Sequence, residues 1–133
     1  SAVALDQNGV LILGATGSGK SSLALQLMGF GAHLVSDDMV WLEAEGGSLF
    51  ACRPDSSPDL IEARGLGVLN AGAVCPRAPI AFVIDLDRAE PDRLPPRRMV
   101  TLGAATAPLI LGAGQPSLAY GVLQMLRHGR ATP

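Results

Sequence analysis

The sequence has few of the residues that build metal centres or disulfide frameworks. Its 133 residues include two cysteines, Cys52 and Cys75, and two histidines, His33 and His128. The cysteines lack metal-ligand spacing and are too few for a disulfide framework, so we expect both thiols to be reduced. The histidines are isolated from each other in the sequence, which argues against a zinc site.

Charge and long apolar runs are also scarce. Charged residues make up 17% of the chain and the formal net charge is -2, so the chain lacks the basic excess typical of proteins that bind nucleic acid or acidic lipid. No apolar run approaches the ~18 residues of a membrane span, and no basic segment precedes the apolar start as in a signal peptide. We therefore expect a cytoplasmic protein with no nucleic-acid partner and no membrane span.

What is present is enough for one packed domain. Hydrophobic residues make up 48% of the chain, and the 16 glycines and 10 prolines are too few for a low-complexity sequence. A chain of this length forms one core more readily than two. We therefore expect a single domain over residues 1–133.

Lysine is nearly absent, and the one exception has an informative position. Of the 10 basic residues nine are arginine, and the only lysine is Lys20. Codon usage can explain an excess of arginine, but not where the single lysine stands. Lys20 occupies the lysine position of residues 14–21, GATGSGKS, which match the phosphate-binding pattern G-x-x-x-x-G-K-[ST] without a mismatch.

The chemistry of phosphate binding explains these residue types. Glycines allow the backbone to turn so that successive N–H groups converge on phosphate oxygens, and the N-terminus of a following helix adds partial positive charge. Lys20 would reach the outer phosphates, and the Ser21 hydroxyl would bind Mg²⁺. A glycine-rich turn kept only for packing does not require the lysine. We assign nucleotide binding to Gly14, Ala15, Thr16, Gly17, Ser18, Gly19, Lys20, Ser21 and Ser22.

The pattern around this motif predicts an α/β domain. Continuous apolar runs predict strands over residues 9–13, 32–36 and 80–86, with a weaker strand over 109–111. Because buried parallel strands and a hairpin occur in one chain, we expect a sheet with both parallel and antiparallel pairs.

Helices, a hairpin and a loop complete the expected elements. Helices are expected over 20–28 and 117–126, and Gly46-Gly47 predicts a hairpin between strands 40–43 and 48–52. Gly65 and Gly67 weaken any regular assignment of residues 60–69, and residues 88–98 form a polar, proline-rich loop.

Two groups of acidic residues compete for the carboxylate that a phosphate-binding loop usually needs at a neighbouring strand end. Asp85 ends the apolar run 80–84 in the manner of an ordinary Walker B strand. Asp37 and Asp38 follow a shorter run and offer two adjacent carboxylates, although such a pair can also be a solvated turn or a helix cap. Spacing alone slightly favours Asp85.

Several segments resemble the bacterial HPr kinase/phosphorylase family. The first comprises residues 9–21, Ala24-Leu25, Gly31 and residues 34–38, with the interval between the loop serine and the aspartate pair matched without a gap. Residues 61–70, IEARGLGVLN, resemble the family signature E-I-R-G-L-G-I-I-N, and residues 92–94 resemble its D-R-L-G element. Together they cover about two thirds of the chain.

The resemblance implies a fold and an activity. The fold would be a phosphate-loop domain with a mixed parallel and antiparallel sheet, like HPr kinase and PEP carboxykinase. The activity would be the Mg-ATP-dependent phosphorylation of a serine of HPr, or of an HPr-like nitrogen-branch carrier, which regulates the phosphotransferase system. Family likeness also implies a hexamer.

It also implies roles for individual residues. Lys20 would contact the β- and γ-phosphates, and Arg64 and Arg93 would stabilise charge on the transferring phosphoryl group. Asp38, with Asp37 beside it, would accept the serine proton, and this reverses the choice in favour of the aspartate pair. The implied Mg²⁺ ligands are Ser21, Glu62 and Asp37.

The sequence departs from the family in several respects. Ser22 stands where the family usually has glutamate, and residues 108–116 lack a basic counterpart of the element tied to the reverse reaction, which argues against phosphorolysis. The family's N-terminal domain has no room in this chain, which resembles the shortened proteobacterial type. Two other functions fit the phosphate-binding loop: a nucleotide-sensing module, and a kinase acting on a small metabolite.

Overall fold

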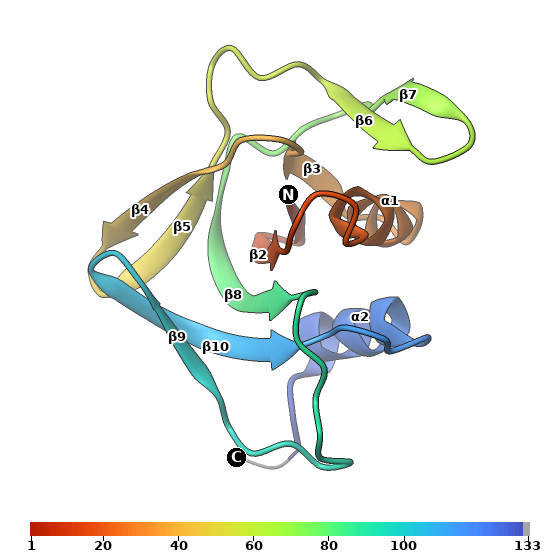
Figure 1. The fold of residues 1–133 in the computed structure, drawn as a ribbon. Coiled ribbons are helices and arrows are strands. Elements are labelled where there is room, and N and C mark those ends of the chain that lie inside the picture. Colours follow the sequence, from red (N-terminus) through yellow and green to blue (C-terminus); the bar gives the residue numbers. More distant parts are fainter. Residues whose placement is uncertain (132–133) are drawn as a thin grey trace.

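Parallel and antiparallel strands build one sheet in the computed structural model, which describes residues 1–131 (Figure 1). The main path through this sheet has the order β3-β1-β2-β8-β10-β9. These strands are β3 (His33–Ser36), β1 (Ala2–Leu5), β2 (Asn8–Leu13), β8 (Arg77–Asp85), β10 (Ala105–Leu111) and β9 (Met99–Leu102). The predicted mixed sheet and the predicted strands near residues 9–13, 32–36 and 80–86 are confirmed.

The three central strands run parallel and end at the same edge of the sheet. Leu13 at the end of β2 and Leu111 at the end of β10 both lie beside Asp85 at the end of β8. Loops that follow parallel strands emerge together at such an edge, which is where ligands bind in open α/β sheets. The segments after residues 13, 85 and 111 therefore meet.

Both helices cover one face of this sheet (Figure 1). Helices α1 (Lys20–Gly29) and α2 (Leu118–His128) confirm the two predicted helices. Their apolar side chains join one core with the strand residues that point toward them, including the fully buried Leu27, Ile84 and Val122. Residues that point to the opposite face, such as Val35 and Val83, form a second core with the hairpin described next.

The hairpin of β4 (Trp41–Glu45) and β5 (Ser48–Cys52) confirms the prediction from Gly46-Gly47. Both glycines have positive φ, 59° and 82°, as a tight two-residue turn between antiparallel strands requires. Strand β5 also pairs with the start of β8, where Ala51 lies opposite Ala78. The hairpin therefore covers the sheet face opposite the helices.

A second hairpin, β6 (Leu60–Ala63) and β7 (Gly67–Asn70), forms a separate two-stranded sheet next to α1. The sequence left this stretch unassigned because of Gly65 and Gly67. Both glycines adopt positive φ, 84° and 117°, where the chain turns, so they connect the strands. Ile61 is 1% exposed within the helix-side core, and the alternation of a strand then turns Glu62 outward.

Strands β1 and β9 were not predicted. The short sequence Ala-Val-Ala-Leu of β1 lacks any alternation because every residue is buried between β2 and β3. Strand β9 exists because the chain turns back at Gly103, which has a φ of 61°, and pairs with β10. Both strands therefore form because they pair with neighbouring strands, and not because of a local sequence pattern.

Residues 88–98 form a loop, as predicted, and one ion pair fixes it. Arg98 donates from Nε and Nη2 to the two carboxylate oxygens of Glu90, each at 2.8 Å. These hydrogen bonds lower the pKa of Glu90. Both cysteines carry free thiols. Within residues 1–131 no helix is long and apolar enough to cross a membrane.

Candidate active site

The predicted phosphate-binding loop connects the end of β2 to the start of α1. Gly17 and Gly19 adopt positive φ, 83° and 104°, and a Cβ at either position would meet nothing within 4 Å. Gly19 precedes α1 and provides no side-chain cap, so the N–H groups of the first helical turn have no partner from that residue. An open backbone at a helix N-terminus is an arrangement that binds anions.

Lys20 and Ser18 also fit a phosphate-bearing ligand. The Lys20 ammonium donates hydrogen bonds to the carbonyl oxygens of Gly14 at 2.6 Å and Ala15 at 3.1 Å, which holds its charge over the loop. The Ser18 hydroxyl is buried and has no hydrogen-bond partner within residues 1–131. A buried hydroxyl without a partner carries a desolvation cost that a bound polar ligand would remove.

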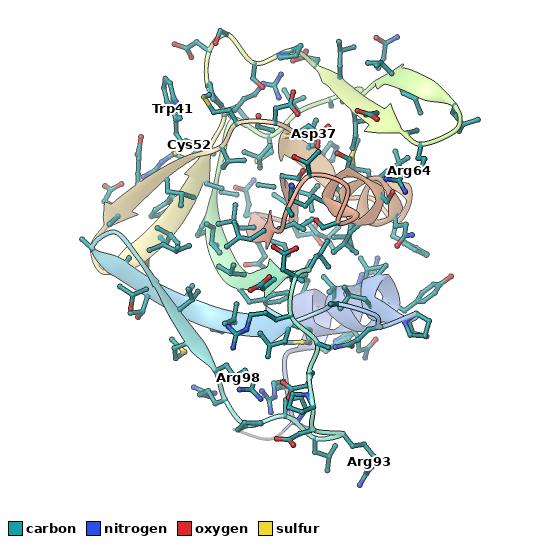
Figure 2. The ribbon with its side chains drawn as sticks, in the orientation of Figure 1. Asp37, Trp41, Cys52, Arg64, Arg93 and Arg98 are labelled. Carbon is teal, nitrogen blue, oxygen red and sulfur yellow. The ribbon has the colours of Figure 1, made fainter. Side chains whose placement is uncertain are left out.

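The aspartate pair lies beside this loop. Asp37 and Asp38 follow β3, and the Asp37 Oδ1 atom accepts hydrogen bonds from the hydroxyls of Ser21 and Ser1, both at 2.8 Å. Figure 2 shows Asp37 near the start of α1. The Asp38 carboxylate is exposed and accepts no hydrogen bond from residues 1–131. The Asp37 carboxylate is therefore held by hydrogen bonds, whereas the Asp38 carboxylate accepts none from these residues.

One cavity of about 380 Å³ brings most of the predicted residues together. The β6–β7 hairpin places Glu62 and Arg64 opposite the helix start. In the described part of the chain no ion pair joins these two side chains, so both remain available to a ligand. The predicted residues that line the cavity are Thr16, Gly17, Gly19, Lys20, Ser21, Ser22, Asp37, Asp38, Glu62 and Arg64.

The remaining predicted residues do not line this cavity. Arg93 lies on the exposed loop between β8 and β9 and does not line this cavity, and Figure 2 shows it far from Asp37 and Arg64. The Glu90–Arg98 pair and the prolines fix this loop at the opposite end of the molecule. The structure therefore does not bring Arg93 beside Arg64, and a role for Arg93 in the site stays a prediction. Gly14, Ala15 and Ser18 belong to the loop itself.

Oxygen donors in this cavity suit a hard cation. The Ser21 hydroxyl and the carboxylates of Asp37 and Glu62 are ligand types that Mg²⁺ prefers. No three His, Cys, Asp or Glu side chains among residues 1–131 lie close enough to hold a metal ion by themselves. Because Mg²⁺ usually takes one or two carboxylates together with substrate phosphates, this donor set fits Mg²⁺ bound with a nucleotide.

Asp87 is a site residue that the sequence did not identify. Its carboxylate accepts the Ala15 N–H through both oxygens, at 3.1 and 3.0 Å, and Asp85 Oδ1 accepts the Asp87 N–H at 2.9 Å. Neither carboxylate lines the 380 Å³ cavity. The Walker-B-like strand end therefore supports the phosphate-binding loop from outside, and only the parallel pairing of β2 with β8 could have revealed this.

Comparison with known proteins agrees with the fold. A family model described as the HPr serine kinase C-terminal domain matches residues 1–103. The HPr kinase/phosphorylase of Geobacillus thermodenitrificans is 42% identical over 92 residues, which are 64% of this chain and 30% of that protein. The HPr kinase/phosphorylase of Brevibacillus brevis is 40% identical over 93 residues, which are 65% of this chain and 30% of that protein.

A solved structure extends the likeness beyond the matched segment. The Hpr(Ser) kinase/phosphatase from Coxiella burnetii superposes with a TM-score of 0.76 at 25% identity, over 95% of this chain and 90% of that chain. This chain spans about 30% of the length of the two curated relatives. The chain belongs to the HPr serine kinase C-terminal domain family.

Proposed function

We propose that this chain is an ATP-dependent protein serine kinase that phosphorylates HPr or an HPr-like phosphocarrier. The observation that carries the proposal is the single cavity in which Lys20 and Ser21 of the phosphate-binding loop face Asp38, Glu62 and Arg64. Phosphoryl transfer depends mainly on positioning and charge stabilisation, and this cavity supplies groups for both. The names of the relatives support HPr as the protein substrate.

The phosphate-binding loop would hold the triphosphate. Backbone N–H groups around Gly17 and Gly19 and the N-terminus of α1 would bind the phosphate oxygens. Lys20 would contact the β- and γ-phosphates from its position over the loop. Ser21, Asp37 and Glu62 would hold Mg²⁺, which when bound offsets charge on the outer phosphates. Arg64, without an ion-pair partner in the described range, would stabilise charge on the transferring group.

The two residues of the aspartate pair would have different roles. Asp37 already accepts two hydroxyl hydrogen bonds, so it would orient Ser21 and the metal. Asp38 is exposed and free of hydrogen bonds from residues 1–131, so it would take the proton from the incoming serine. A serine hydroxyl is a poor nucleophile, and a carboxylate within hydrogen-bond reach assists its attack.

Mass spectrometry tests the function. The protein would be incubated with Mg-ATP and either HPr or its nitrogen-branch relative, and the carrier examined for a serine phosphate. We expect phosphoserine on one carrier, and none when EDTA removes Mg²⁺. ATP binding without transfer to a carrier would favour the sensing module, and transfer to a small hydroxyl compound would favour a metabolite kinase.

Removal of the Asp87 carboxylate is expected to weaken nucleotide binding. Without it the Ala15 N–H loses its acceptor and the loop loses a support that does not touch the ligand. We expect Asp87→Ala to lower the affinity for Mg-ATP by about threefold to tenfold, the usual range for one hydrogen bond. Isothermal titration calorimetry measures this, with the exposed loop variant Asp55→Ala as control. An unchanged affinity in folded Asp87→Ala would contradict the role.

A further inference from the structure

Arg53 follows β5 and carries a guanidinium that is nearly buried. Its side chain is 9% exposed, whereas those of Arg77 and Arg98, the other arginines that form ion pairs within residues 1–131, are 40% and 26% exposed. A cation removed from water is stabilised only where hydrogen bonds and an opposite charge replace its hydration. The partners of Arg53 must therefore compensate for the lost water.

The guanidinium of Arg53 spans two segments of the chain. Its Nη1 donates a hydrogen bond to the carbonyl of Val35 on β3 at 2.9 Å. Its Nη2 donates to the carbonyl of Ser57 at 2.8 Å and also pairs with the carboxylate of Asp59. The backbone N–H of Arg53 donates to the carbonyl of Pro76 at 2.8 Å, which ties its backbone to the segment before β8. Arg53 therefore joins β3 to the loop before β6.

A second hydrogen bond links the same two segments. The hydroxyls of Ser36 and Ser57 lie 2.8 Å apart, and Ser36 is fully buried. Within residues 1–131, residues 54–59 are joined to β3 by this hydrogen bond and by those of Arg53. Removal of the guanidinium would leave the two hydroxyls as the one hydrogen bond between the loop and the strand in this range.

Each of the two linked segments leads directly into the candidate site. Asp38 is three positions after Val35, and Glu62 is three positions after Asp59. A cavity of about 160 Å³ lies between the segments, and both Asp38 and Glu62 line it as well as the 380 Å³ cavity. Arg53 lines neither cavity. Its effect on the site would therefore pass through the segments that it joins.

We propose that Arg53 is a positioning residue for phosphoryl transfer, which holds the Asp38 carboxylate at a fixed distance from the β6–β7 hairpin that carries Glu62 and Arg64. The proposal rests on the proposed function, because this distance matters to the rate only if Asp38 accepts the proton of the incoming serine. A displacement of a catalytic group by about 1 Å can lower a rate by about 10²-fold. The expected effect of Arg53 is therefore on transfer and not on nucleotide binding.

The geometry of these contacts requires an arginine. The carbonyls of Val35 and Ser57 accept from different nitrogens of the planar guanidinium, whereas all three donors of an ammonium are at one nitrogen. Arg53→Lys keeps the charge beside Asp59 and should lose one of the two carbonyl contacts. Arg53→Met keeps an unbranched side chain and loses both contacts and the charge.

Thermal stability, Mg-ATP affinity and the initial rate of carrier phosphorylation at saturating ATP test the proposal together. We expect Arg53→Met to keep a Mg-ATP affinity close to that of wild type and to transfer phosphate about tenfold to 10²-fold more slowly. Arg53→Lys should recover part of the rate. Arg77→Met is the matched control and should keep both values, because Arg77 lies opposite Cys52 on β8 and its ion pairs are outside the site.

Combination with Asp38→Asn distinguishes positioning from a general loss of structure. Residues that act as a unit are not additive. If Arg53 acts by positioning Asp38, Arg53→Met should slow the Asp38→Asn protein much less than it slows wild type. A merely structural role predicts the same fold loss of rate in both backgrounds.

Three results would overturn the proposal. They are a wild-type rate in folded Arg53→Met, an equal fold loss in the two backgrounds, and a loss of Mg-ATP affinity as large as the loss of rate. If Arg53→Met does not fold, Arg53→Lys is measured in both backgrounds and judged by the same three results. If wild type transferred no phosphate to either carrier, the proposed function itself would fail, and the positioning role with it.

Discussion

Asp38→Asn is expected to lower the rate of serine phosphorylation by about 10²- to 10⁴-fold, the usual contribution of a positioned general base. The substitution keeps the size of the side chain and removes the carboxylate that would accept the serine proton. Asp38 is exposed, lines the cavity with Lys20, and accepts no hydrogen bond from the described residues. Its loss should therefore leave the loop and its hydrogen bonds unchanged.

Measurement of binding together with transfer makes the Asp38 prediction specific. The affinity for Mg-ATP, measured by calorimetry, should stay close to that of wild type, while the initial rate of carrier phosphorylation falls. Asp55→Asn, an exposed aspartate on another loop, serves as the matched control and should keep both values. A transfer rate in Asp38→Asn equal to wild type would refute the assigned role, and the sensing module would predict no transfer in either protein.

Lys20→Ala is expected to weaken ATP binding and to lower transfer by about 10²- to 10³-fold, as for loss of a charged group that acts on the developing transition-state charge. Loss of the ammonium would also leave the carbonyl oxygens of Gly14 and Ala15 without their present donor. Both effects act on the same loop, so affinity and rate should fall together.

Lys20→Arg distinguishes charge from shape. It keeps the positive charge, but the planar guanidinium cannot replace a compact ammonium on a flexible stem. We expect partial recovery of ATP affinity and little recovery of transfer, measured by calorimetry and by the initial rate. Full activity in Lys20→Ala would contradict the role of the loop. If Lys20→Ala lost thermal stability together with activity, the loss of activity would indicate misfolding instead.

Local signals were sufficient to predict the elements that flank the glycine-rich motif. The apolar run before the motif and the helix after it are contiguous with it in the sequence, and β2 and α1 confirm these two elements. The hairpin at Gly46-Gly47 was equally local. Such features depend on turn geometry and burial over a few residues, which a sequence displays directly.

The partners of the loop could not be predicted in this way. Spacing alone favoured Asp85, and only the family resemblance pointed to the aspartate pair. The structure explains the difference: β3 reaches the loop by pairing with β1, a buried strand without any alternating pattern. Asp87 reaches Ala15 because β2 and β8 pair in parallel, with Leu13 beside Asp85. Long-range pairing of this kind is not visible in the sequence.

Arg93 shows the opposite case. A short motif implied a place in the site, but the loop that carries it is fixed elsewhere by the pair of Glu90 with Arg98. The contrast with Arg64 is physical: Arg64 follows a hairpin strand whose Ile61 is buried against α1, so its position relative to the loop is determined by the core. In this chain the segment packed on the core reaches the cavity, and the exposed loop does not.

Transfer of label from γ-phosphate-labelled ATP to the carrier tests the central claim most directly. The purified protein would be incubated with labelled Mg-ATP and the carrier, in parallel with a carrier whose target serine is replaced by alanine. We predict that label appears on the serine-containing carrier alone and that Asp38→Asn, although it binds ATP, transfers almost none. ATP binding with no label on either carrier would contradict the account.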